Sequence, residues 1–338
     1  MKKIIFVSLM FSSVAMLGQE DVHFSQFFMT PVNANPAASG VYAGDIRLGG
    51  VYRNQWSSIV DAYSTMGFYG DFKLFRGKID NGYFGLGFDI NKDDAGDSKF
   101  SMLQGNLALS YILEIDGDKN MLSAGLQGGY IQRSISYDAL YWDEQYTGNG
   151  FNTALPTGEE AFPAQSVGVP DAGVGIHWLY RPDDLTIINA GISASHLLSP
   201  DVSFTKAAPQ NLLRKFTLHF NGEFEKKNTD YAFLPAAIIS FQGPNRYFNL
   251  GTEIKYFVKH KAKYTGFSEE VSFSLGPYYR FGDALYAVAR FNMAGFTLGA
   301  SYDFTMSDLS YSNKSLGGME FTLMWRGNFG GGSSLKFY

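Results

Sequence analysis

The chain has 338 residues, of which 45% are hydrophobic and 16% aromatic, and its formal net charge at pH 7 is −5. Single-domain barrels and sandwiches reach this length, and the abundance of aromatic residues and glycine favours an all-β protein. The lack of cysteine excludes disulfides, thiol nucleophiles and cysteine metal sites, and the mildly acidic balance argues against a nucleic-acid partner.

Residues 1–18 have the layout of a secretory signal peptide. The stretch MKKIIFVSLMFSSVAMLG begins with two lysines, continues with an apolar run from Ile4 to Leu17 and ends on a small residue. A transmembrane anchor is the alternative, but the run is shorter than the roughly 20 residues of a spanning helix. We expect cleavage after Gly18, and the loss of the two lysines takes the formal net charge from −5 to −7.

Residues 19–44 form a segment without strand or helix character. Its centre, FSQFFMTPVNANPAASG (residues 24–40), shows neither alternation nor a helical stripe. Its prolines cannot donate to a β ladder, so we expect a non-strand segment at the start of the mature chain.

Residues 45–327 alternate between apolar and polar side chains, which is the pattern of half-buried strands. In SMLQGNLALSYIL, for example, Leu107 and Leu109 lie on one face, and Asn106 and Ser110 lie on the other. The pattern predicts about fourteen strands, at 45–54, 61–75, 80–92, 99–115, 119–134, 170–181, 185–198, 214–227, 230–243, 246–259, 268–282, 283–294, 295–305 and 317–327.

The two faces of these strands favour a membrane barrel over a soluble sandwich. The polar faces are rich in Gly, Ser, Asn, Gln and Thr, and the apolar faces often carry Tyr or Trp near a strand end. Membrane barrels have apolar outer faces with aromatic girdles, polar inner faces and, in bacterial single chains, an even number of strands. We therefore predict an all-β fold, a transmembrane antiparallel β-barrel of about fourteen strands.

The predicted connections alternate in length. Short turns such as IDGDK and RPDD contrast with long links at 134–169 and 199–213. In outer-membrane barrels the short turns are periplasmic and the long loops extracellular. The chain ends in a Gly-rich C-terminal tail, residues 328–338.

The sequence contains no recognised catalytic constellation. G-x-S-x-G and H-E-x-x-H motifs are absent. The acidic stretches NKDDAGD and EIDGDKN do not match a calcium-binding EF-hand loop. We therefore expect no enzyme activity, no cofactor and no metal site, and a barrel hydrolase with a Ser–His pair stays open as an alternative.

Five short motifs bracket the mature chain. In order they read D-x-x-FSQ-(Y/F), NPA-x-x-G, YR-x-QW, YD-x-x-x-S-x-L and a Gly-then-Glu pair in the last strand. The matching residues are Asp21, Phe24, Ser25, Gln26, Asn35, Pro36, Ala37, Gly40, Tyr52, Arg53, Gln55, Trp56, Tyr302, Asp303, Ser307, Leu309, Gly318 and Glu320. In these motifs the chain resembles the PorP/SprF family of type IX secretion system membrane proteins, although its tail extends past the usual end of the family.

The resemblance implies a non-enzymatic outer-membrane barrel of Bacteroidota, exported through a cleaved signal peptide. It implies a role in secretion or surface attachment of cargo, such as gliding adhesins with a type B C-terminal domain. The implied partners are the secretion machinery, that cargo, a periplasmic peptidoglycan-linked component and outer-membrane lipid, and not nucleic acid. A passive porin or a hydrophobic-solute transporter is the alternative.

The long loop carries four aromatic residues that we regard as possible cargo contacts. Tyr and Trp dominate the hot spots of protein interfaces, although the same rings could simply pack the loop onto the barrel. These residues are Tyr141, Trp142, Tyr146 and Phe151.

The N-terminal motif segment then has a physical role. A mature N-terminus starts on the periplasmic side of an even-stranded barrel, and aromatic residues favour burial. We expect the segment to pack in or under the lumen as a partial plug, with Gln26, Asn33 and Asn35 hydrogen-bonded to polar lumen groups. A plain lead-in that closes the barrel is the alternative.

Overall fold

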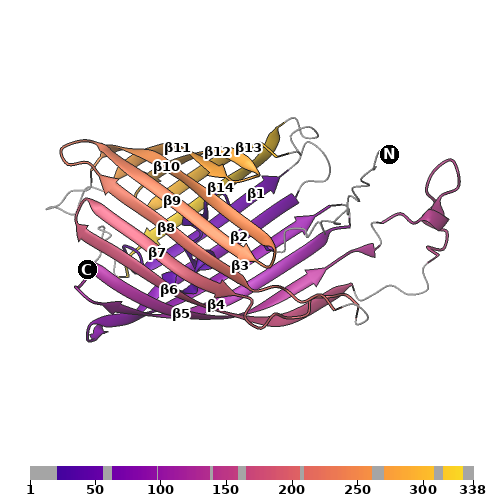
Figure 1. Ribbon diagram of the computed structural model, residues 1–338, viewed down its shortest axis with the longest axis horizontal. Coiled ribbons are helices and arrows are strands. Elements are labelled where there is room, and N and C mark those ends of the chain that lie inside the picture. Colours follow the sequence, from indigo (N-terminus) through magenta and orange to yellow (C-terminus); the bar gives the residue numbers. More distant parts are fainter. Residues whose placement is uncertain are drawn as a thin grey trace, which may run out of the picture.

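The computed structural model is a closed antiparallel β-barrel in which each strand pairs with its neighbours in sequence (Figure 1). β1 closes the barrel against β14, with Ile46 opposite Gly327. The strands are β1 (Ile46–Gln55), β2 (Tyr63–Ile79), β3 (Gly82–Ala95), β4 (Phe100–Glu114), β5 (Asn120–Ser134), β6 (Ser166–Asp183), β7 (Thr186–Ser195), β8 (Lys215–Glu225), β9 (Tyr231–Gln242), β10 (Asn245–Lys259), β11 (Val271–Arg280), β12 (Ala284–Met293), β13 (Phe296–Thr305) and β14 (Leu316–Gly327).

The structure describes most, but not all, of the chain. The described ranges are 21–55, 63–96, 98–137, 140–158, 165–205, 209–260, 270–307 and 315–329. The predicted signal peptide, most of the predicted tail and the motif residues Trp56 and Leu309 lie outside these ranges.

The prediction of fourteen strands is confirmed, and the main differences are in strand length. β6 begins at Ser166, four residues before the predicted start, and pairs with β5 as far as Ser134. Gly168 and Pro170 obscure the alternation there, so the sequence pattern ends too early. β2 likewise continues to Ile79, past the predicted residue 75.

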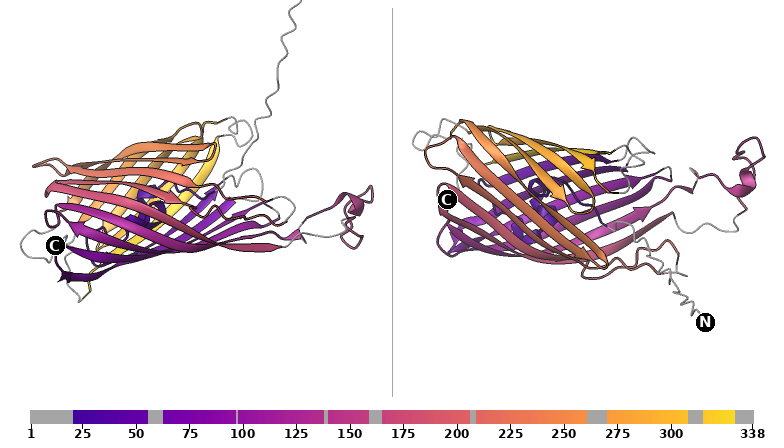
Figure 2. Two further views of the ribbon diagram at one scale, coloured as in Figure 1. Left: turned by 60° about the horizontal axis from the view of Figure 1, so that its bottom comes forward. Right: turned by 45° about the horizontal axis from the view of Figure 1, so that its top comes forward.

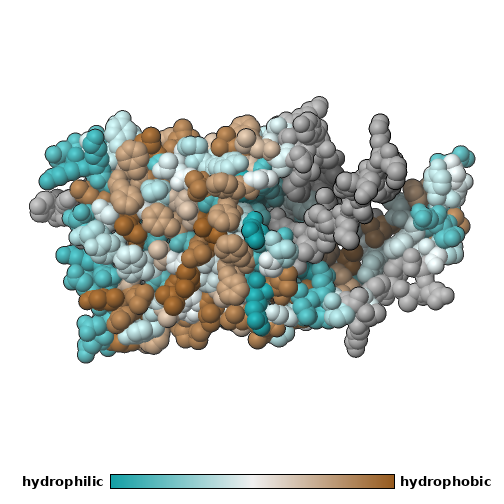
Figure 3. Space-filling view, in the orientation of Figure 1, coloured by the Kyte–Doolittle hydropathy of each residue, from teal (hydrophilic) through white to brown (hydrophobic). Residues whose placement is uncertain are grey.

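The barrel wall is apolar outside and polar inside, as predicted. In β4, Leu107 is 67% exposed and Leu109 is 48% exposed, whereas Asn106 and Ser110 are buried. Figure 3 shows hydrophobic residues over a wide band of the wall, with hydrophilic residues gathered at one end. A continuous apolar surface of this kind suits lipid rather than water.

The two ends of the barrel differ. At the end where β1 begins and β14 ends, several hairpins are short, as at residues 80–81 and 294–295, although the link from β10 to β11 is longer. At the opposite end, longer links join β5 to β6 and β7 to β8, and the β5–β6 connection projects far beyond the rim (Figure 1). We call these the short-turn end and the long-loop end.

Residues 21–44, the N-terminal segment, lie inside the barrel rather than in its sheet (Figure 2). The segment contains three short helical turns, η1 (Phe27–Met29), α1 (Pro31–Ala34) and η2 (Pro36–Ala38). Prolines open α1 and η2, where no backbone N–H is needed. Within the described residues, no helix is long and apolar enough to cross a membrane.

The direction of this segment differs from the expectation of a periplasmic start. Asp21 contacts His196 and Lys215, which lie at the long-loop end. The chain then runs through the lumen and reaches the short-turn end at Asp45, directly before β1. The expectations of a periplasmic start and of periplasmic short turns therefore do not hold together. The first of them placed the start of the chain at the start of the first strand, whereas the segment before β1 is long enough to traverse the lumen.

Candidate functional site

The FSQ motif is bound by a carboxylate on the last strand. The backbone N–H groups of Ser25 and Gln26 donate to the two oxygens of Glu320, each at 2.7 Å. The Gln26 side chain donates to the Glu320 carbonyl at 3.3 Å and accepts from the Thr322 hydroxyl at 3.1 Å. Glu320 is 1% exposed. A buried carboxylate is tolerated only with such partners, and here the N-terminal segment supplies them.

Two arginines and a second carboxylate surround this contact. Arg53 on β1 lies 3.3 Å from Asp303 and 3.6 Å from Glu320. Arg280 on β11 lies 2.9 Å from Asp303. All four side chains are almost fully buried. Two cations thus face two carboxylates, and this pairing offsets the cost of removing the four charges from water.

The same arginines also bind the N-terminal segment directly. Arg53 donates to the carbonyl of His23 at 2.9 Å, and Arg280 donates to the hydroxyl of Ser25 at 2.6 Å. Tyr286 on β12 donates to the Ser25 carbonyl at 2.8 Å. We call Ser25, Gln26, Arg53, Arg280, Asp303 and Glu320 the charged network.

The NPA motif is bound on the opposite side of the barrel. The side-chain amide of Asn35 donates to the carbonyls of Ile176 (2.9 Å) and Ile192 (3.2 Å) and lies 3.1 Å from the Nε2 atom of His219. Its carbonyl oxygen accepts from the backbone N–H of Ala37 and caps η2. The predicted hydrogen bonds of Gln26 and Asn35 to lumen groups are therefore present.

Two glycines of the wall let the backbone at the NPA motif lie directly against the strands. A Cβ atom at Gly125 would lie 2.6 Å from the Cα atom of Ala37, and one at Gly85 would overlap the carbonyl of Ser39. Only glycine permits such close backbone approach. We call Gly85 and Gly125, on β3 and β5, the glycine wall.

The end of the NPA-x-x-G motif is fixed near the short-turn end. Gly40 has a φ of +78°, the left-handed region that favours glycine, and its N–H donates to Asp71 at 2.7 Å. Arg47 binds both oxygens of Asp71 at 2.8 Å and the carbonyl of Ala38 at 3.1 Å. Tyr83 donates to the Gly40 carbonyl at 3.0 Å.

The other end of the segment is held at the long-loop end. Asp21 lies 2.7 Å from the Nζ atom of Lys215 and 3.3 Å from the Nε2 atom of His196, whose Nδ1 atom lies 2.7 Å from Asp171. Burial lowers the pKa of His196, but the hydrogen bonds with Asp171 and Asp21 outweigh it and raise the pKa to about 9. Burial favours a higher pKa for Asp21, but Lys215 and His196 hold that pKa well below its usual range.

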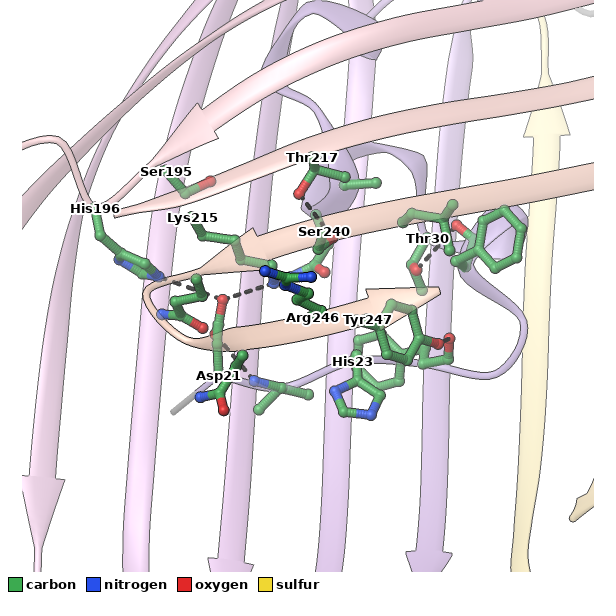
Figure 4. A pocket seen from close by; sticks show the side chains of 18 of the residues that line it. Asp21, His23, Thr30, Ser195, His196, Lys215, Thr217, Ser240, Arg246 and Tyr247 are labelled. Atoms are coloured by element: carbon green, nitrogen blue, oxygen red, sulfur yellow. Dashed lines mark hydrogen bonds and ion pairs between the residues drawn. The ribbon is translucent and has the colours of Figure 1, made fainter. Parts of the chain in front are cut away.

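A cavity of about 300 Å³ lies beside this end of the segment (Figure 4). Its lining includes Asp21 and Asn33 from the N-terminal segment, Lys215 from β8 and Arg246 from β10. Within the described residues, no cluster of three or more His, Asp or Glu side chains could hold a metal ion.

Other motif residues lie away from these contacts. Tyr52 is 39% exposed on the outer face of β1, and Tyr302 packs on the outer face against Phe304, with ring centroids 4.9 Å apart. Gln55 ends β1, and Ser307 follows β13. These residues do not meet the N-terminal segment.

The aromatic residues of the long loop cluster with one another. The ring of Phe151 lies 5.1 Å from that of Tyr141 and 5.2 Å from that of Tyr146. All three side chains are more than half exposed, and Trp142 is partly buried beside them. They stand on the projecting part of the loop, beyond the rim.

Several partners of the N-terminal segment were missed from the sequence. Arg47, Asp71 and Arg280 all lie on inward strand faces. The available signal was a charged residue inside an apolar stretch, as in the series Tyr279, Arg280, Phe281. A strand residue of this kind must be paired if it faces a packed lumen.

The family model described as "Type IX secretion system membrane protein PorP/SprF" matches residues 16–324. The chain belongs to the PorP/SprF family. Family and fold together assign this PorP/SprF barrel to the outer membrane and to type IX secretion. Five members of the charged network are motif residues predicted from the sequence, and the sixth member, Arg280, was not predicted.

Solved structures with similar folds include the toluene transporter TbuX of Ralstonia pickettii, with 10% identity, a TM-score of 0.47 and coverage of 87% of this chain and 92% of that one. A FadL homologue of Pseudomonas aeruginosa has 12% identity, a TM-score of 0.39 and coverage of 86% and 91%. BamA of Haemophilus ducreyi has 11% identity, a TM-score of 0.40 and coverage of 84% and 70%. These values are too low to transfer a function. A search of curated proteins finds no match.

Proposed function

We propose that this PorP/SprF barrel is a non-enzymatic holder of exported surface proteins, such as adhesins with a type B C-terminal domain. In this proposal the lumen is plugged by the N-terminal segment and cargo binds at the long-loop end. The observation that carries the proposal is the path of the segment, which is bound to opposite walls of the barrel.

The crossing of the lumen supports the plug. Phe27 packs in a buried cluster with residues of β9, β11 and β12, including Ile238 and Tyr286. The turn η2 contacts β4, β5 and β6, which lie across the barrel from β11 and β12. Hydrogen bonds at both walls then hold the segment across the lumen. A solute could pass only after this segment had moved.

The projecting loop supports a partner at the long-loop end. Tyr141, Tyr146 and Phe151 present exposed rings that cluster with one another on the projecting loop. Large exposed apolar patches mark interaction sites, and Tyr and Trp are enriched in the hot spots of protein interfaces. We propose that these rings and Trp142 contact cargo, and that the short turns meet a peptidoglycan-linked periplasmic component.

The test is quantitative proteomics of the cell surface and culture medium, in the parent strain and in a clean deletion of this gene. The proposal expects one or two large surface proteins to leave the surface or to appear in the medium. Loss of all type IX cargoes together would instead make the barrel a core component of the machinery. An unchanged surface proteome would contradict the proposal.

The cavity gives a specific reason to test a second function, the passage of small solutes. Planar-bilayer recordings of the purified barrel distinguish the two functions, because a plugged lumen conducts little. High conductance, together with impaired solute uptake in the deletion strain, would favour a porin or transporter.

A further inference from the structure

The cavity at the long-loop end extends into the lumen. It extends from Arg246 and Asp283 at the rim to Asn106 and Ile238, near the middle of β4 and β9. The N-terminal segment forms part of its lining, which includes Asp21, Phe27 and Asn33. Its volume of about 300 Å³ is at the lower end of the range for ligand sites.

The mouth of the cavity is lined by three basic side chains, and one of them has no carboxylate partner among the described residues. Lys215 pairs with Asp21, and Arg280 pairs with Asp283 and Asp303. Arg246 lines the same mouth, and its guanidinium has no carboxylate partner among the described residues. Figure 4 shows Arg246 and Lys215 directed into the cavity beside Asp21. An incoming anion would therefore find an available guanidinium.

A second polar group at the mouth also lacks a partner. The side-chain nitrogen of Asn245 is buried and has no hydrogen-bond partner within the described residues, and Asn245 lines the cavity next to Arg246. A buried N–H group without an acceptor is costly. Among the described residues, the site thus combines a guanidinium that has no carboxylate partner with an unsatisfied amide donor, which suits an anionic acceptor.

Deeper in the cavity the lining alternates between amide, hydroxyl and apolar groups. Gln127, Thr217 and Ser240 offer donors and acceptors, and Phe27 and Ile238 offer an apolar surface. The donors and acceptors suit the main chain of a polypeptide, and the apolar surface suits an apolar side chain.

We propose that this cavity binds the carboxyl terminus of an exported polypeptide. The terminal carboxylate lies against Arg246 and the Asn245 amide, and the last side chain points toward Phe27 and Ile238. A planar carboxylate matches the guanidinium fork. A chain end carries a main-chain carboxylate, whereas an internal segment offers a carboxylate only on an Asp or Glu side chain. The inference rests on the proposed function, which brings polypeptides to this end of the barrel.

The site already accommodates one carboxylate of the chain itself. Asp21 binds Lys215 and His196 at the same mouth. Arg246 would receive the second carboxylate without displacing the first.

The test uses the purified full-length barrel in detergent and a glycyl-alanyl-phenylalanine tripeptide with a fluorophore on its amino end. Fluorescence anisotropy compares the free-acid peptide with its C-terminal amide. We expect the free acid to bind at least about tenfold more tightly, the size of one charge-assisted hydrogen-bonded contact. Arg246→Gln should abolish this preference, and Arg246→Lys should restore part of it.

Arg214→Gln is the matched control, because Arg214 is exposed at the same rim but does not line the cavity. It should keep the preference for the free acid. Heat-dependent migration on SDS gels checks that each variant is a folded barrel. Equal binding of acid and amide, no binding of either, or equal effects of Arg214→Gln and Arg246→Gln would overturn the inference.

This outcome is separable from the outcome for the proposed function. If the gene deletion releases cargo but the purified barrel ignores the carboxylate, the cavity inference fails and the holder function stands. If the barrel prefers the free acid but the deletion leaves the surface proteome unchanged, the holder function fails and the peptide site stands.

Discussion

The N-terminal segment rests on two walls that use different chemistry. On one side, the charged network holds Ser25 and Gln26 through ion pairs and hydrogen bonds contributed by β1, β11, β13 and β14. On the other, the glycine wall of β3 and β5 admits Ala37 and Ser39 because it presents no side chain. The first wall recognises the segment by its hydrogen-bonding groups, and the second recognises it by shape.

The difference predicts how each wall fails. Removing one member of the charged network leaves other charges buried without partners, which is strongly destabilising. Adding one methyl group to the glycine wall only pushes the segment away, at the smaller cost of overpacking. Both walls hold the same short segment, so each can be tested by the release of that segment.

Deleting residues 21–40 removes the contacts to both walls and should have the largest effect. The fourteen strands close on one another without the segment, so we expect a folded barrel with an open, water-filled lumen. Planar-bilayer recordings should show large currents for the deletion variant and small ones for the complete chain. An unchanged conductance together with unchanged cargo display would show that the segment is not a plug.

Glu320→Ala tests the charged network alone. It removes the acceptor for two backbone N–H groups and leaves Arg53 with one carboxylate fewer. Loss of one partner of a buried ion pair costs about 3–5 kcal/mol. Hydrogen exchange measured by mass spectrometry should show residues 24–30 losing most of their protection.

Glu225→Ala is the control for this change. Glu225 ends β8 at the short-turn end, and its ion pair with His260 is partly exposed. Protection of residues 24–30 should stay as in the parent protein. Equal exchange in the two variants would mean that Glu320 does not hold the segment.

Gly125→Ala tests the glycine wall. The new methyl group would lie 2.6 Å from the Cα atom of Ala37, so we expect a loss of about 1–3 kcal/mol and faster exchange in residues 35–40. Gly128→Ala, on the same strand, is the control because its methyl group meets nothing within 4 Å. If the two variants exchange alike, close packing at Gly125 is not what holds the NPA motif.

The sequence predicted the barrel well because strand alternation is local. The alternation within one strand predicts that Leu107 faces outward and Asn106 inward, and no information about the neighbouring strands is needed. The sequence also identified Ser25, Asp303 and Glu320 as motif residues, but it did not predict that they contact one another. Hydrogen bonds between residues nearly 300 positions apart depend on the register in which β1 and β14 close the barrel. The role of Gly125 could not be predicted, because a glycine in a strand does not indicate which backbone segment will pack against it.

The direction of the N-terminal segment differs most from the sequence-based expectation, and the physical cause lies at Asp21. Nothing in the local sequence indicates that this carboxylate contacts His196 and Lys215, which lie at the long-loop end of the barrel. These ion pairs form a separate attachment that neither wall provides. Because they hold only the start of the segment, their loss should have a local effect, smaller than the loss of either wall.

The attachment at Asp21 should weaken as the pH rises. The pKa of His196 is about 9 in the folded protein, against about 6.5 for an unperturbed histidine. The charged imidazolium therefore stabilises the folded contact fully below about pH 6.5, and this contribution is lost as the pH rises to about 9. Asp171 and Asp21 face the ring, and Lys215 shares Asp21 with it.

A spin label can report this loss, because the chain has no cysteine of its own. A label on Val22→Cys should become more mobile between pH 6.5 and pH 9, since Val22 adjoins Asp21. His196→Gln should make the label mobile across the range and remove the pH dependence. His260→Gln, an exposed histidine at the other end, should leave the pH profile unchanged. Mobility that is constant, or that rises as the pH falls, would mean that His196 does not hold the start of the segment.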